Sequence, residues 1–192
     1  VAQKIFEKQK ISVDVKTGLS EEEIIKIIPE YDGMVVRSAT KVTKNIILAG
    51  KKLKVIARAG AGVDNIDVPT AKENNMLVMN TPGGNTNATA EHALALIMSA
   101  LRKIPYANDT THKGKWEKKN IKGTELSKKT LGIVGFGNVG ARLSNLVKGF
   151  GVNILVSSKS LESRKKDFSH VKNVSFDELI STSDIISFHC KA

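Results

Sequence analysis

The sequence predicts an α/β protein with two parallel-sheet domains, and three features support this prediction. Short apolar runs rich in β-branched residues alternate with segments of helical periodicity along the 192 residues. The glycine motif Gly135-Phe-Gly-Asn-Val-Gly140 joins one such run to one such segment. The turn-forming stretch at 81–87 separates the alternation into two groups. We therefore place the domains at 1–84 and 85–192.

Strands and helices are expected in turn through the first domain. The end of a helix is predicted for 1–10, and further helices for 24–28, 44–49 and 67–74. Strands are predicted at 11–15, 34–36, 55–57 and 77–79, with helices on both faces of the sheet. Ser20 and Glu23 have the spacing of a capping box, and Thr43 and Asp67 are further N-cap candidates.

The second domain opens on a long helix, which we expect to end near Pro105. Residues 106–129 are basic and polar, and their densest basic run, 113–119, is expected to be a solvated loop. Ser175 and Glu178 form a second capping-box pattern. Strands are predicted at 131–134, 154–156, near 174 and at 184–190, and a helix over 139–150 closed by Gly151.

The position of the glycine motif between a strand and a helix indicates its function. Gly135 can make a tight turn, Gly137 lets the backbone approach a pyrophosphate, and Gly140 lets the helix pack against the strand. The N-terminus of that helix offers free N–H groups and the positive end of its dipole to phosphates. We therefore predict a dinucleotide site. The alternative is a plain glycine-rich turn in an α/β protein.

A second candidate site lies in the first domain, in the segments that follow two strands. Arg37 and Ser38 follow the strand at 34–36, and Arg58 begins the loop that holds Gly60-Ala-Gly62. Ligands of parallel sheets bind beyond the carboxyl ends of the strands. Arginine provides paired donors, and a glycine-rich loop provides backbone N–H groups, for an anion. We predict a small anionic substrate here; the alternatives are a surface arginine and a simple strand-to-helix turn.

Composition limits the binding partners that we expect for the protein. The net charge of +11, from 30 basic and 19 acidic residues, suits an anionic substrate and cofactor as well as nucleic acid. Aromatic content is only 5%, with Trp116 alone among lysines, which argues against nucleic acid as a partner.

Cys190 is the single cysteine, so a disulfide framework is excluded and a reducing, cytoplasmic setting is expected. Neither a signal peptide nor an apolar run of about 18 residues is present, so we expect no membrane association.

Four stretches resemble the D-isomer-specific 2-hydroxyacid dehydrogenases and together span nearly the whole chain. They are 36–42, 58–67, 78–82 with 85–92, and 123–126 followed by the glycine motif. The resemblance implies a flavodoxin-like substrate domain and a Rossmann NAD-binding domain. Within the family, the pair Arg37-Ser38 favours the branch that oxidises D-3-phosphoglycerate to 3-phosphohydroxypyruvate in serine biosynthesis, by hydride transfer to NAD.

The resemblance and the glycine motif together name the site residues. The substrate-binding candidates are Arg37, Ser38, Arg58, Gly60, Ala61, Gly62 and Asn85. The cofactor-binding candidates are Ala61, Gly135, Gly137, Asn138, Val139, Gly140, Ser158 and Cys190. The family's catalytic arginine, glutamate and histidine are expected beyond residue 192, and no metal site is expected. The histidines that do not match the catalytic position are His92, His112, His170 and His189.

The choice of cofactor depends on Ser158. In NAD-binding units an acidic residue about 20 positions past the glycines binds the ribose hydroxyls, and Ser158 stands in its place. No carboxylate there repels a 2′-phosphate, while Lys159 and Arg164 are near enough in sequence to attract one. We predict NAD, with Ser158 hydrogen-bonded to the ribose, and keep NADP as the alternative.

Three other functions remain open. A glyoxylate or hydroxypyruvate reductase would need no phosphate site. Transcriptional corepressors share the fold and the glycine motif, so a non-catalytic nucleotide sensor is the second alternative. Nucleic-acid binding by the basic face is the third and would show a steep dependence on salt.

The sequence is also expected to be a piece of a longer protein. A strand is missing before the first predicted helix, and the second domain contains about four of the six strands of a full dinucleotide fold. Both domains are therefore predicted to be truncated, and the chain alone is predicted to be inactive. A homodimer or homotetramer is expected, as is usual in the family that the chain resembles.

Overall fold

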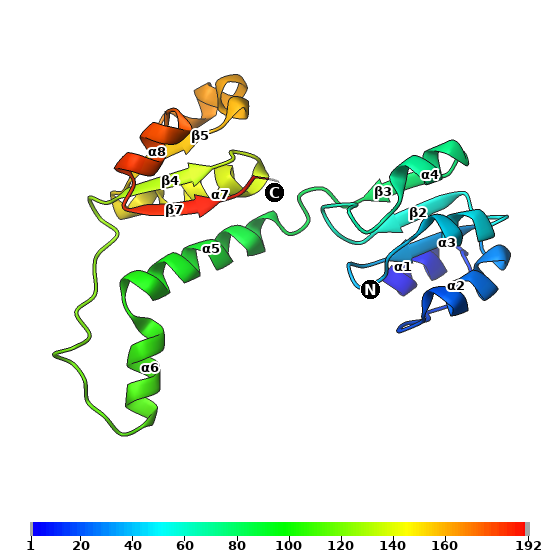
Figure 1. Cartoon of the computed structure of the whole chain (residues 1–192), viewed down its shortest axis with the longest axis horizontal. Coiled ribbons are helices and arrows are strands. Elements are labelled where there is room, and N and C mark those ends of the chain that lie inside the picture. The colour runs from blue at the N-terminus through cyan, green and yellow to red at the C-terminus, as the bar shows by residue number, and fades with distance from the viewer. Residues whose placement is uncertain (1, 191–192) are drawn as a thin grey trace. The chain divides into compact units, whose positions relative to one another are not determined.

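Two units divide the chain in the computed structural model, Val1–Pro82 and Gly83–Ala192. The structure describes residues 2–190, without the side chains of Ala2 and of residues 162–166. Each unit contains one β-sheet whose strands are all parallel (Figure 1). Among the described residues, no helix has the length and apolar character needed to cross a membrane.

The sheet of the first unit aligns the ends of its three strands. Its order is β1-β2-β3, formed by Gly33–Val36, Val55–Arg58 and Leu77–Asn80. The register places Val36 beside Arg58, and Arg58 beside Asn80. Because the strands run in the same direction, the loops that follow them start at one edge of the sheet.

Helices pack on one face of this sheet. They are α2 (Glu21–Ile27), α3 (Lys44–Ala49) and α4 (Val68–Glu73), and their apolar side chains form one core with Val36 and Ile56. The opposite face carries Val35, Leu77 and Met79, which are 55%, 59% and 50% exposed. The predicted cover of both faces is therefore incomplete in the described residues.

The N-caps of this unit are the predicted ones. Ser20 Oγ accepts from Glu23 N–H, and the Glu23 carboxylate accepts from Ser20 N–H at 2.8 Å, which completes the capping box of α2. The side chains of Thr43 and Asp67 cap α3 and α4 by accepting from the N–H groups of Ile46 and Thr70. A short 3₁₀ helix at Ile28–Glu30 contains Pro29, where α2 was predicted to stop.

The start of the chain differs from the prediction in one element. Helix α1 covers Ala2–Lys8 as expected, but residues 11–15 form no strand. Ile11 and Val15 are 50% and 67% exposed. A strand needs a hydrogen-bonded neighbour, and β1 pairs with β2 alone in the described sheet. Apolar alternation at 11–15 was therefore not sufficient to predict a strand.

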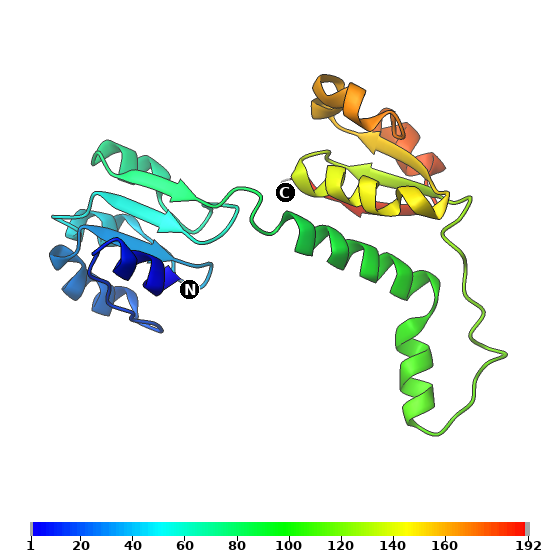
Figure 2. The same cartoon turned by 180° about the vertical axis from the view of Figure 1, so that it is seen from behind.

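The second unit has helices on both faces of its sheet. The strand order is β6-β5-β4-β7, formed by Lys172–Asn173, Asn153–Ser157, Thr130–Val134 and Ile185–Phe188. Helix α7 (Asn138–Val147) lies on one face and α8 (Phe176–Thr182) on the other (Figure 1 and Figure 2). Two 3₁₀ helices, Lys148–Phe150 and Lys159–Phe168, complete the connections.

The predicted long helix is present, and a second helix that was not predicted follows it. Helix α5 covers Thr86–Leu101 and packs along α7, and α6 covers Ile104–His112. Lys103 between them has a φ of 51°, which interrupts the helix. Pro105 was predicted to end α5, but it lies in the first turn of α6, where proline's missing N–H costs no hydrogen bond. The basic run at 113–119 has no regular helix or strand, as predicted, and Trp116 is 83% exposed.

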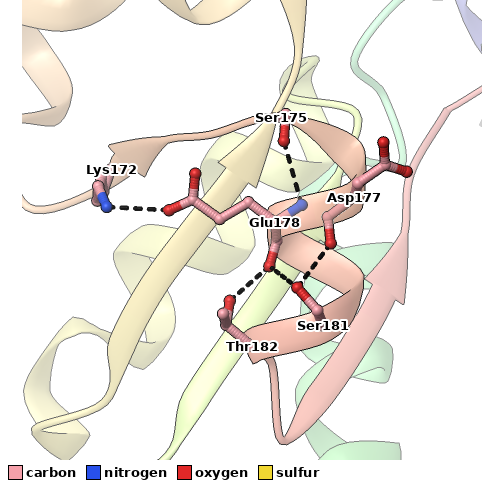
Figure 3. Close-up of polar contacts among 6 residues, drawn as sticks. All are labelled: Lys172, Ser175, Asp177, Glu178, Ser181 and Thr182. Carbon is pink, nitrogen blue, oxygen red and sulfur yellow. Dashed lines mark hydrogen bonds and ion pairs between the residues drawn. The ribbon is translucent and has the colours of Figure 1, made fainter.

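Helix α8 shows half of its predicted capping box (Figure 3). Ser175 Oγ accepts from Glu178 N–H at 3.1 Å, which is the serine half. The Glu178 carboxylate instead accepts from Lys172 Nζ at 3.1 Å. The glutamate therefore connects α8 to β6.

Asp184 connects the starts of β4 and β7 and should make stability depend on pH. Its carboxylate accepts from Thr130 N–H at 2.8 Å and from Lys129 Nζ at 3.1 Å, and these contacts lower the pKa of Asp184. A lowered carboxyl pKa contributes stability above the unfolded-state pKa, and this is lost as pH falls through the folded-state value. We expect Asp184→Asn to lower the Tm at pH 7, and the difference from the native protein to shrink below about pH 4.

The matched control is Asp167→Asn, which removes the same charge from an exposed position for which no hydrogen bond or ion pair is described, away from the first turn of a helix. Thermal melts of the native protein and both variants between pH 2.5 and 7 measure the effect. A Tm difference for Asp184→Asn that is the same at every pH would contradict this account.

Candidate functional site

The carboxyl edge of the first sheet brings three predicted substrate-binding elements together. Arg37 and Ser38 directly follow β1, are exposed, and start a turn that ends at Thr40. Arg58 is the last residue of β2, and the loop with Gly60, Ala61 and Gly62 follows it. Among the described residues, the Arg37 guanidinium has no hydrogen-bond or ion-pair partner, so it is available to a ligand.

Arg58 differs from Arg37 because its side chain is largely covered. It is 13% exposed, and its Nη1 lies 3.1 Å from Asp64 Oδ1 in an ion pair whose aspartate is 83% exposed. Its Nε is buried and has no acceptor among the described residues. A Cβ at Gly60 would lie 3.3 Å from Arg58 Nε, and one at Gly62 would lie 2.9 Å from Arg58 Nη1. The glycine loop therefore folds closely around the guanidinium.

The same loop has backbone donors without acceptors. Within the described part of the chain, the N–H groups of Ala61, Gly62 and Val63 make no hydrogen bond. Backbone N–H groups without acceptors beside a cation are suited to binding an anion. Asp64 and Asn65 also shape this loop; both lie in the family-like stretch 58–67, but no role was predicted for either of them from the sequence.

The glycine turn of the second unit has the geometry that a dinucleotide needs. Gly135 has a φ of 88°, and a Cβ there would lie 2.7 Å from Cys190 N, so a side chain is excluded. A Cβ at Gly140 would overlap with Gly135 O, which shows how closely α7 approaches the turn. At Gly137, the N-cap of α7, the space where a Cβ would lie is open. The backbone can therefore come close to a ligand at Gly137.

The first turn of α7 is free to bind an anion. Asn138 and Val139 start the helix, and no described side chain caps it. The first N–H groups of a helix have no partner within the helix, and the positive end of the dipole lies there. Both properties favour phosphate oxygens at this end of the sheet.

The remaining cofactor candidates lie at neighbouring strand ends. Ser158 directly follows β5, and Cys190 follows β7 and is exposed. Ser158 Oγ lies 2.9 Å from Ser160 Oγ, and Ser160 Oγ donates to Phe136 O at 3.1 Å, so the serines are connected to the glycine turn. Lys159 is exposed, whereas the side chain of Arg164 lies outside the described residues.

Two hollows are described on the surface, and only one of them reaches a candidate site. It runs beside β1 from Asp14 and Tyr31 to Val36 and Thr40, so it ends next to the turn that begins at Arg37. The other is lined by Asn153, Lys172 and neighbours that include Glu178, where β5 and β6 begin, at the end of the sheet away from the glycine turn. We assign the candidate sites from the strand ends, because ligands of parallel sheets bind there. Among the described residues, no group of three or more His, Cys, Asp or Glu side chains could hold a metal.

The four histidines occupy unrelated places. His92 and His112 are exposed, and His112 Nδ1 lies 2.8 Å from Asn108 O. Burial lowers the pKa of His170 and, to a smaller extent, so does the nearby Lys148. Burial also lowers the pKa of His189, whose Nε2 lies 2.9 Å from Ser187 Oγ.

Comparison with known proteins identifies the family of this chain. Residues 1–186 match the D-isomer specific 2-hydroxyacid dehydrogenase catalytic domain. The chain belongs to the D-isomer-specific 2-hydroxyacid dehydrogenase family. The earlier resemblance is thereby confirmed.

Relatives within this family carry two different names. D-3-phosphoglycerate dehydrogenase of Synechocystis sp. is 50% identical over 95% of the chain, which covers 33% of that protein. Hydroxypyruvate reductase of Thermotoga maritima is 45% identical over 97% of the chain, which covers 60% of that protein. The NAD⁺-bound 3-phosphoglycerate dehydrogenase of Entamoeba histolytica superposes with a TM-score of 0.77 at 34% identity, over 99% of the chain and 57% of that structure. The chain thus spans between a third and three fifths of these family members.

The glycine turn of the second unit predicts two different mutant phenotypes. Gly140→Ala would force a methyl group against Gly135 O, and we expect it to lower the free energy of unfolding by about 1–3 kcal/mol. Gly137→Ala enters open space, so we expect a loss of stability within about 1 kcal/mol but a clear loss of nucleotide affinity. Urea unfolding and calorimetric titration with NAD⁺ measure the two effects. Equal losses of stability in both variants would contradict the packing argument.

Proposed function

We propose that this chain forms part of an NAD-dependent D-3-phosphoglycerate dehydrogenase, which oxidises its substrate to 3-phosphohydroxypyruvate for serine biosynthesis. The observation that carries the proposal is the edge of the first sheet, where Arg37, Arg58 and the free N–H groups of the glycine loop lie at neighbouring strand ends. Such an edge suits a substrate with two anionic groups, a carboxylate and a phosphate. The 50% identity to the Synechocystis enzyme supports the phosphorylated substrate.

Each substrate residue has a distinct role in this proposal. Arg37, which is exposed and has no partner among the described residues, binds the phosphate together with Ser38. The N–H groups of Ala61 and Gly62 bind the carboxylate, and Arg58 holds their loop in shape. Asn85 precedes α5 and is exposed; its role as a substrate contact remains a proposal from the family resemblance.

The second unit fits a dinucleotide. Gly137 leaves open space at the N-terminus of α7, and Gly135 and Gly140 allow the turn to come that close. Asn138 and Val139 would meet the pyrophosphate, and Ser158 would meet the ribose at the end of β5. Cys190 and Ala61 are proposed as further cofactor contacts. NAD⁺, when bound, accepts the hydride from C2 of the substrate, while the hydroxyl proton goes to a base.

The base is proposed to lie outside residues 1–192. His92 and His112 are exposed on helices, and His189 is engaged with Ser187. His170 lines the hollow where β5 and β6 begin, away from the glycine turn. The arginine, glutamate and histidine that would orient the substrate and move its proton are therefore assigned to the rest of the protein, as the family resemblance implies.

A hydroxypyruvate reductase is the second candidate, because the Thermotoga maritima relative of that name is 45% identical. The two candidates differ in whether Arg37 is needed. The sensor and the nucleic-acid alternatives gain no specific observation from the structure.

We also propose that the enzyme works as a homodimer or homotetramer. Leu96, Ile104, Tyr106 and Trp116 expose large apolar surface on α5, α6 and the loop that follows. A second copy of the chain is the proposed partner of that surface. The single cysteine supports a reducing, cytoplasmic setting for the enzyme.

The function is tested with Arg37→Ala in the protein at its complete natural length. We expect kcat/KM for 3-phosphohydroxypyruvate with NADH to fall about 100-fold or more, because a desolvated phosphate loses its charged partner. Hydroxypyruvate and glyoxylate should be reduced with little change. Lys51→Ala, which removes an exposed charge at the opposite end of the sheet, is the control. Equal use of all three substrates by the native enzyme would favour the reductase, and nucleotide binding without any turnover would favour the sensor.

The cofactor is tested with Ser158→Asp. A carboxylate at the end of β5 should repel a 2′-phosphate, so we expect the ratio of NAD⁺ to NADP⁺ affinity to rise at least about tenfold. Calorimetric titration with each nucleotide gives the ratio without turnover, and Ser169→Asp at the far end of the 3₁₀ helix is the control. A native protein that already excludes NADP⁺ as strongly as the variant would show that Ser158 does not set the preference.

A further inference from the structure

The loop from Ala59 to Asn65 is hydrogen-bonded to the segments that follow both neighbouring strands. On the side of β1, Asn65 Nδ2 donates to Thr40 O at 2.6 Å and to Arg37 O at 3.0 Å. On the side of β3, Asn80 Nδ2 donates to Ala61 O at 2.6 Å, and Thr81 N–H donates to Gly60 O at 3.0 Å. The loop therefore connects all three strand ends of the first sheet.

The backbone position of Arg37 depends on these hydrogen bonds more than on any contact of the Arg37 side chain. Its side chain is exposed and has no partner among the described residues. Its backbone lies in a turn whose own hydrogen bond, from Thr40 N–H to Arg37 O, is long at 3.4 Å. The two shorter bonds from Asn65 close the same turn. Asn65 is therefore the main side chain that fixes the backbone from which the Arg37 guanidinium projects.

The chemistry at this point requires an amide donor. Both acceptors are backbone carbonyl oxygens, so the nitrogen of the Asn65 amide must face them, and the assignment of its two ends is settled. The backbone of Asn65 is held as well, because Val42 N–H donates to Asn65 O at 2.8 Å. The side chain is thus anchored close to its own Cα and has little freedom to move away from the turn.

We propose that Asn65 is a positioning residue that sets the preference for phosphorylated over unphosphorylated substrates. It does so by holding the turn at 37–40 in a fixed position relative to the glycine loop. The proposal rests on the proposed function, in which Arg37 binds the phosphate and the glycine loop binds the carboxylate. Asn65 touches neither group of the substrate. It fixes the distance between their two binding elements, because it belongs to one of them and is bonded to the other.

The test compares Asn65→Ala with Asn74→Ala in the protein at its complete natural length. Asn74 Nδ2 donates to Thr70 O at 2.8 Å at the end of α4, so its variant loses one side-chain-to-backbone bond in the same unit, away from the loop. The readout is kcat/KM for 3-phosphohydroxypyruvate divided by kcat/KM for hydroxypyruvate. We expect this ratio to fall roughly tenfold in Asn65→Ala, through a higher KM for the phosphorylated substrate, and to stay within about twofold in Asn74→Ala.

A double variant shows whether Asn65 acts through Arg37. If it does, Arg37→Ala with Asn65→Ala should have the same substrate ratio as Arg37→Ala alone, because the arginine that Asn65 positions is already absent. Additive losses would overturn the proposal. Asn65→Ser provides a second route if the alanine variant does not fold: its hydroxyl retains a shorter donor, and we expect an intermediate ratio with a native-like Tm.

The possible outcomes distinguish a failure of the proposed function from a failure of the inference about Asn65. A native ratio near one would overturn both the proposed function and this inference. A strong native preference that Arg37→Ala abolishes, but that Asn65→Ala and Asn65→Ser leave unchanged, would overturn the inference alone. Equal losses for both substrates in Asn65→Ala would also overturn it, because they would show a general structural role.

Discussion

Parallel pairing of the strands is the constraint on which both candidate sites depend. In the first unit, the register that sets Val36 beside Arg58 and Arg58 beside Asn80 makes three loops start at one edge. In the second unit, the pairing of β4 with β5 and β7 does the same for the glycine turn, Ser158 and the segment at Cys190. Residues far apart in sequence thereby become neighbours without any dedicated contact between their side chains.

Close packing against the backbone is the second constraint, and glycines allow it in two loops. In the turn after β4, glycines make room for other backbone: Gly135 for the segment at Cys190, and Gly140 for the turn itself. In the loop after β2, they make room for two paired side chains, Arg58 and Asp64. In the described residues, the first arrangement leaves helix N–H groups without acceptors, and the second leaves loop N–H groups without acceptors beside a cation. Both arrangements suit the proposed binding of anions largely by backbone groups.

Much of the fold could be predicted because its signals are local. The caps at Ser20, Thr43 and Asp67 and the strand–turn–helix at Gly135 each depend on a few neighbouring residues. The predictions failed where contacts between distant segments of the chain decide the local structure. Residues 11–15 alternate correctly but lack a strand partner, and Pro105 fits the start of a helix as well as the end of one. In the candidate site, the placement of Arg37 and Arg58 at strand ends followed from the pattern, but the contacts of Asp64 and Asn65 required the folded loop.

The covered Arg58 has a consequence for how the first site responds to its surroundings. Asp64 lies six positions along the same loop, so the arginine carries a tethered counter-ion at a high effective concentration. An external anion that takes Arg58 Nη1 must exchange with this carboxylate rather than add to a bare charge. The free energy gained by binding is then only the difference between two similar ion pairs. Arg58 therefore responds weakly to the concentration of dissolved anions and remains a stable part of the loop. The exposed Arg37 has no such internal competitor among the described residues, so bulk salt and substrate compete for it directly.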